Sequence, residues 1–248
     1  FEAGIEPGAA VGFVALLLVA CQGPPQNHAG DETIPDGRAG AMVRLKPTAP
    51  APPHPARDPK RSSPPCPAGM VGIDDELCPG LKHTCLERRE AWQCARFSPD
   101  SRCEGDVLPL RYCIDRYEYP NRSGVEPTLM VSWFEAQRRC QAEGKRLCTE
   151  PEWSLACEGP RHLPFPYGYV RDAEACNIDR ATRYMDLARL FDPLTQADEL
   201  ARIDQREPSG NRPRCVSEYG VYDLTGNVDE WVVNPSGHPY RSSLKGGN

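Results

Sequence analysis

Apolar positions in the second half of the chain first recur with the spacing of a helix between residues 131 and 144. Trp133, Ala136 and Cys140 stand at i, i+3 and i+7, which places them on one helical face. Ser132 lies three residues before Glu135, an arrangement in which the hydroxyl and the carboxylate each satisfy a free amide at a helix start. The pattern therefore predicts a helix that begins at Trp133, buries Cys140 and ends at the next glycine.

A second helix is predicted a few residues further on, over residues 150–158. Thr149 and Glu152 repeat the capping arrangement, and Pro151 lies in the first turn, where its missing N–H costs nothing. Trp153 and Cys157 then share the inward face, and a Gly-Pro pair ends the helix.

The remaining patterns predict short strands and irregular chain. Residues 107–117 mix apolar, aromatic and charged side chains as a strand does, and Pro120 ends the segment. Little periodicity follows residue 168, although residues 186–203 could carry a short helix. Two short helices with several short strands indicate the α+β class, with little regular secondary structure.

The amino-terminal part has the pattern of an export signal. Residues 9–20 form an apolar run too short to span a bilayer stably, and the run ends in Leu18-Val19-Ala20-Cys21. This order is typical of a bacterial lipoprotein, in which Cys21 becomes the lipidated first residue. The alternative is a secreted protein without lipid. Because nothing before Arg38 is basic, we expect the true start to lie upstream, and Gln22 favours attachment to the outer membrane of the cell envelope.

Composition divides the chain into four parts. Residues 1–20 are the predicted remnant of a signal peptide, and residues 21–65 form a Pro-rich tether that is too polar to pack. Residues 66–105 are rich in cysteine, and residues 106–248 form the predicted domain. The net charge is −6 and the basic residues are scattered, so we exclude nucleic acid as a partner and expect the membrane, through the lipid anchor.

The chain contains 12 cysteines, many more than is usual in a reducing compartment. With Cys21 set aside, 11 remain, and the cysteines up to Cys113 contain no CxxC pair of the kind that holds zinc. Disulfides are therefore predicted, with a connectivity that the sequence leaves open.

An acidic turn near the carboxyl end is the strongest candidate for a metal site. Asp223, Asp229 and Glu230 flank Gly226, so that carboxylates and carbonyls could converge on a hard cation such as calcium. The alternative is a turn whose acids cap main-chain amides.

Three segments together resemble one known family. They are residues 131–159, residues 219–231 with the sequence YGVYDLTGNVDEW, and residues 114–118 with the sequence IDRYE. They are similar to the domain of formylglycine-generating enzymes, the sulfatase-modifying family. The resemblance covers about residues 69–248 and implies a fold related to C-type lectins.

The resemblance also implies two structural calcium sites. The family's loop binds calcium through side-chain and main-chain oxygens, and the matching positions are Asp223, Gly226, Val228 and Glu230. A second site begins at an Asn-Ile pair, for which Asn177 and the Ile178 carbonyl are the nearest match. The sequence between residues 186 and 210 diverges too far for its remaining ligands to be placed.

In the family, Cys140 and Cys157 match helix cysteines whose disulfide partners lie near the carboxyl end, which here means beyond Asn248. Active members also bind copper(I) through two cysteines just past a Gly-Gly turn, and no pair up to Asn248 matches them. The resemblance thus implies an oxidoreductase that uses copper to convert a cysteine of exported sulfatases to formylglycine, with its catalytic cysteines beyond residue 248. The alternative is a non-catalytic binding module for an envelope ligand, stabilised by calcium and disulfides.

Overall fold

The computed structural model describes residues 18–19, 21–22, 65–90 and 93–247. Its strands are β1 (Leu18–Val19), β2 (Cys21–Gln22), β3 (Met70–Leu77), β4 (Leu81–Arg88), β5 (Cys94–Cys103), β6 (Leu108–Asp115), β7 (Arg146–Leu147), β8 (Gly226–Val233) and β9 (Ser242–Gly247). Its helices are α1 (Trp133–Ala142), α2 (Glu150–Glu158), α3 (Leu187–Phe191) and α4 (Gln196–Ile203). The mixture of short helices and small sheets confirms the predicted α+β class.

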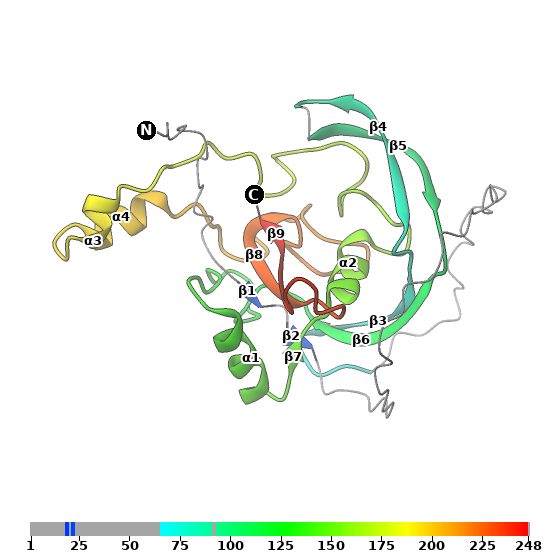
Figure 1. Cartoon of the computed structure of the whole chain (residues 1–248), viewed down its shortest axis with the longest axis horizontal. Helices are drawn as coiled ribbons and strands as arrows, with labels where there is room; N and C mark the ends of the chain where they lie inside the picture. Colours follow the sequence, from blue (N-terminus) through cyan, green and yellow to red (C-terminus); the bar gives the residue numbers. More distant parts are fainter. Residues whose placement is uncertain (1–17, 20, 23–64, 91–92, 248) are drawn as a thin grey trace, which may run out of the picture.

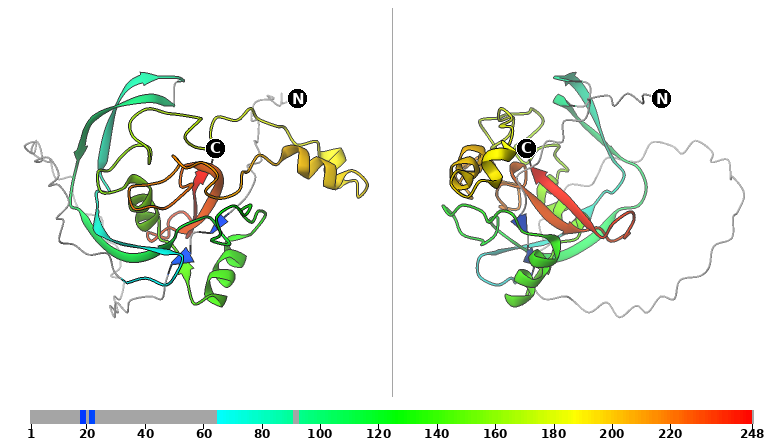
Figure 2. Two further views of the ribbon diagram at one scale, coloured as in Figure 1. Left: turned by 180° about the vertical axis from the view of Figure 1, so that it is seen from behind. Right: turned by 60° about the vertical axis from the view of Figure 1, so that its left-hand side comes forward.

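Three small sheets organise these elements (Figure 1). One has the order β3-β6-β2-β7, a second has the order β1-β8-β9, and β4 pairs with β5 in a two-stranded ribbon. The antiparallel pair β3–β6 runs in register from Met70↔Asp115 to Leu77↔Leu108. The ribbon β4–β5 extends beyond this pair, and Figure 2 shows from behind that α3 and α4 stand apart from the sheets.

The main core lies where α2 packs against β3, β6 and β8. Ile73, Ile114, Leu155 and Val232 are fully buried there, and Trp153 covers them with 7% of its surface exposed. A second cluster holds α1 against β7 through Ala136, Cys140 and Leu147. The long segment between α2 and β8, residues 159–225, is anchored at both ends because α2 and β8 belong to the main core.

Both predicted helix starts are confirmed. The Ser132 hydroxyl accepts a hydrogen bond from the Glu135 amide at 3.3 Å, and α1 begins at the next residue, Trp133. The capping box of α2 is complete, because the Glu152 carboxylate accepts from the Thr149 amide at 2.7 Å. The strand expected over residues 107–117 is β6, and the segment 186–203 contains the two helices α3 and α4.

The predicted leader and tether lie mostly outside the described residues. Within them, β1 pairs with β8 in parallel, and Cys21 and Gln22 of β2 pair with β7. The backbone at the predicted lipidation site therefore lies in a sheet, which the export pattern did not anticipate. Lipidation of Cys21 stays a prediction. Among the helices that the structure describes, none has the length and apolar character needed to cross a membrane.

The disulfides resolve part of the connectivity that the sequence left open. Four bridges join Cys66–Cys113, Cys78–Cys103, Cys85–Cys94 and Cys176–Cys215. The first connects the Cys-rich segment to β6, so that β3 and the ribbon are tied to the rest of the domain. Cys140 is also disulfide-bonded within this chain, which corrects the expectation of a partner beyond Asn248. Cys157 is a free thiol, and its pairing with a later cysteine stays a prediction.

Candidate calcium loop

The loop that leads into β8 has an irregular backbone that turns main-chain groups away from the sheet. Asp223, Gly226 and Asn227 all have positive φ angles, of 60°, 84° and 58°. The pairing of β8 with β9 jumps from Gly226 to Asp229, so that Asn227 and Val228 do not follow the ladder. Gly226 is required here because a Cβ atom would lie 2.4 Å from the carbonyl oxygen of Asn177.

Two of the predicted calcium ligands are buried carboxylates. Glu230 is 2% exposed, and its Oε2 accepts a hydrogen bond from the Trp153 indole of α2. Asp223 is 5% exposed, and its Oδ2 accepts from the Gly210 amide at 2.6 Å. Burial raises the pKa of Glu230 to about 8 and that of Asp223 to about 6, and the hydrogen bonds from Trp153 and Gly210 offset this only in part.

A third buried carboxyl, Glu118, lies at the same place and was not predicted as a site residue. Its Oε2 accepts from the Ser209 hydroxyl at 2.8 Å and from the side-chain amide of Asn227 at 2.6 Å, whereas its buried Oε1 has no hydrogen-bond partner among the described residues. Burial, followed by the charges of Asp223 and Glu230, raises its pKa well above the usual value. The IDRYE motif contained this residue, but only the fold brings it to the loop.

The chemistry of this donor set fits a divalent cation. Buried carboxylates and main-chain carbonyl groups are the oxygen ligands that calcium prefers, and the bulged backbone of this loop leaves carbonyl groups outside the ladder. Among residues 65–90 and 93–247, no three His, Cys, Asp or Glu side chains are placed to hold a metal. A cation at this loop would therefore be held by Asp223 and Glu230 together with main-chain oxygens such as those of Gly226 and Val228.

The second predicted pair lies beside this loop. Asn177 is 4% exposed, and its main-chain carbonyl accepts from the main-chain amide of Asn227 at 3.0 Å. Ile178 is 2% exposed and packs against the Cys176–Cys215 disulfide. The structure thus brings the two predicted calcium segments together, with Asn227 between them.

The free thiols do not fit copper(I). Cys148 is fully buried, and burial raises its pKa well above the usual value. Burial likewise raises the pKa of Cys157 to about 12, and its Sγ lies 3.6 Å from the Leu224 carbonyl. Copper(I) binds thiolates, and burial disfavours the thiolate form of both side chains.

These observations define an α+β domain that is stapled by disulfides and has a buried acidic loop. Residues 113–247 match the family described as "Sulfatase-modifying factor enzyme 1-like domain". The match covers more than half of the chain, and the protein belongs to this family.

Known relatives include both active and inactive members. The formylglycine-generating enzyme of Bos taurus is 30% identical over 132 residues, covering 46% of this chain and 32% of the relative. The inactive C-alpha-formylglycine-generating enzyme 2 of Bos taurus is 28% identical, covering 51% of this chain and 40% of the relative. The hercynine oxygenase of Mycolicibacterium smegmatis is 32% identical, covering 45% and 22%. The chain therefore spans well under half the length of each relative.

Proposed function

We propose that this protein oxidises a cysteine of exported sulfatases to formylglycine, and that residues 113–247 belong to the scaffold of that activity. The proposal is supported by membership of the sulfatase-modifying-factor family and by similarity to formylglycine-generating enzymes. The catalytic thiols would lie beyond Asn248, because the two free thiols of the described residues do not match the family's pair of cysteines after the Gly-Gly turn. Copper(I), when bound to such a pair, would activate oxygen for the oxidation. We also propose that the domain has the C-type lectin-like fold of the family.

The observation that carries the proposal is the uncompensated pair of Asp223 and Glu230 at the position of the family's calcium loop. Both side chains are at least 95% buried, and within the described part of the chain neither forms an ion pair, so ionising them is costly unless a cation is bound. Calcium there would be structural. It would fix the bulged start of β8 against Trp153 of α2, and so hold the end of the described chain in one place.

Placement in the envelope is a further part of the proposal. The apolar run before Cys21 favours lipidation and attachment to the outer membrane. The disulfides Cys78–Cys103 and Cys85–Cys94 staple the exposed ribbon β4–β5, as suits an oxidising compartment outside the cytoplasm. Exported sulfatases would meet the enzyme in the envelope.

The test is oxidation of a peptide that contains Cys-x-Pro-x-Arg by the full-length protein loaded with copper(I) in the presence of oxygen. Mass spectrometry with a hydrazide reagent would detect the aldehyde, and the matched control is the same peptide with serine in place of cysteine. We expect an aldehyde only from the cysteine peptide. A protein that melts cooperatively and binds calcium but produces no aldehyde would contradict the proposal and would favour the binding module.

A further inference from the structure

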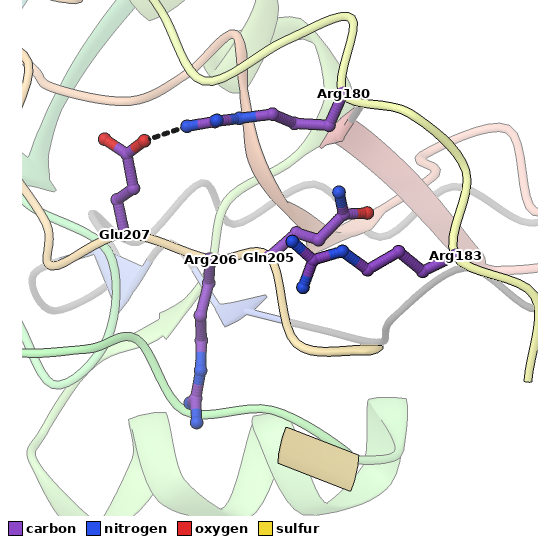
Figure 3. Close-up of a pocket in the computed structure, with 5 residues that line it drawn as sticks. All are labelled: Arg180, Arg183, Gln205, Arg206 and Glu207. Carbon is purple, nitrogen blue, oxygen red and sulfur yellow. Dashed lines mark hydrogen bonds and ion pairs between the residues drawn. The ribbon is translucent and has the colours of Figure 1, made fainter. Parts of the chain in front are cut away.

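The side chain of Asn177, which the resemblance assigns to a second calcium ion, is hydrogen-bonded to the guanidinium of Arg180. The Arg180 guanidinium donates from Nε to Asn177 Oδ1 at 2.7 Å. Its Nη2 forms an ion pair with Glu207, as Figure 3 shows. One guanidinium therefore bridges the Asn177 segment and the chain that enters the acidic loop.

The orientation of the Asn177 amide is fixed by its other hydrogen bonds. Its Nδ2 donates to the Gln205 carbonyl at 2.9 Å and to Asn227 Oδ1 at 3.0 Å. These two acceptors require the nitrogen on their side, so the oxygen must face Arg180. A cation could reach this oxygen only by displacing the guanidinium.

The nearby carboxylate is also compensated. Glu207 forms ion pairs with both Arg180 and Arg212, the latter at 2.7 Å. Hydrogen bonds from Arg212 and Asn211 lower the pKa of Glu207 to about 2, and it is ionised at every physiological pH. This contrasts with Asp223 and Glu230, which have no ion pair and raised pKa values.

The surroundings of Arg180 are unfavourable to a metal ion. A pocket of about 150 Å³ is lined by Arg180, Arg183, Gln205, Arg206 and Glu207. In Figure 3, Arg206 points away from Arg180, whereas Arg183 lies on the same side of the pocket. Of the three arginines that line the pocket, Arg180 pairs with the Glu207 carboxylate, and the positive charges of the lining repel a divalent cation.

We infer that Arg180 takes the place of the second calcium ion, so that Asn177 and Ile178 bind no metal. The arginine does what the ion would do. It ties the segment after Cys176 to Glu207, and it orients Asn177, whose own hydrogen bonds reach Gln205 and Asn227. The inference refines the calcium part of the proposed function, but the role of Arg180 does not depend on calcium binding at residues 223–230.

Calcium counting in the full-length protein tests the inference. Equilibrium dialysis against calcium would be performed on the wild type, Glu230→Gln and the double variant E230Q/N177A. We expect at most one calcium per chain in the wild type and none in Glu230→Gln. A calcium ion that persists in Glu230→Gln and disappears in the double variant would overturn the inference. An ion that persists in both would lie elsewhere and leave Asn177 without metal, as inferred.

Thermal melting in chelator tests the arginine separately. Arg180→Gln should lower the melting temperature by about 3 °C or more, because it breaks the ion pair with Glu207, which joins two segments, and the hydrogen bond that orients Asn177. The matched control is Arg183→Gln, which lines the same pocket but donates only to the carbonyls of Arg202 and Asp204 and should have less than half that effect. Equal melting of Arg180→Gln and the wild type would overturn the role of Arg180. If Arg180→Gln does not fold, Arg180→Lys replaces it, with an intermediate loss expected.

A wild type that binds no calcium would contradict calcium binding at residues 223–230, while the loss of stability in Arg180→Gln would still support the arginine bridge. The two proposals can therefore fail separately.

Discussion

Raising the pH in the presence of a chelator should destabilise the protein through Glu230. Its pKa in the fold is about 8, against 4.5 for the free side chain. A folded pKa above the unfolded one means that the folded state binds the proton more tightly. The contribution of Glu230 to the free energy of unfolding is therefore fully present below the unfolded pKa and is lost as the pH rises towards 8.

The magnitude follows from the size of the shift. A difference of about 3.5 pKa units corresponds to about 5 kcal/mol, at 1.36 kcal/mol per unit. Asp223 titrates in the same direction, with a pKa of about 6, but it interacts with Glu230, so the two effects do not simply add. A total loss of about 3–5 kcal/mol corresponds to a fall in melting temperature of roughly 10 °C for a domain of this size.

The assay is thermal melting at pH 5 and pH 8.5, with calcium or with EDTA. Calcium favours the ionised carboxylates, so its stabilising effect should be small at pH 5 and about 10 °C at pH 8.5. Glu230→Gln is the control, because it keeps the shape of the side chain and removes the charge, and both effects should shrink. A melting temperature in EDTA that is equal at the two pH values, with no gain from calcium, would refute the reasoning.

Three other outcomes are expected. Thr149→Ala should lower the free energy of unfolding by about 1 kcal/mol in urea titrations, since it removes the cap of α2; an unchanged midpoint would show that the cap is not needed. Cys148 should react with a thiol reagent only after unfolding, and rapid labelling of this residue in the native protein would contradict its burial. In bacterial cells, Cys21→Ala should abolish labelling by a radioactive fatty acid, and a wild type that takes up no label would disprove the lipoprotein prediction.

Local patterns predicted the helices well because their causes lie within a few residues. Ser132 and Thr149 each accept a hydrogen bond from the amide three residues later, so the sequence alone contains both partners. The burial of Cys140 likewise follows from helical spacing. The Asp223 to Glu230 loop was found because its residues are contiguous and its motif resembles that of the family.

Features that depend on distant partners were not predicted. Glu118 is buried by contacts with Ser209 and Asn227, which follow it by about a hundred residues, and no spacing rule connects them. Arg180 bridges Asn177 and Glu207 across a segment in which the sequence shows little periodicity. The pairing of β1 with β8 was missed because a short apolar run has the same pattern in a leader and in a strand.

A crystal of the calcium-loaded protein, measured at a wavelength where calcium scatters anomalously, tests the central claim most directly. We predict one anomalous peak inside the loop, within bonding distance of Asp223 and Glu230, and no peak beside Asn177, where the Arg180 guanidinium should appear instead. A peak bound to Asn177 with Arg180 displaced, or a loop without any peak, would contradict the account.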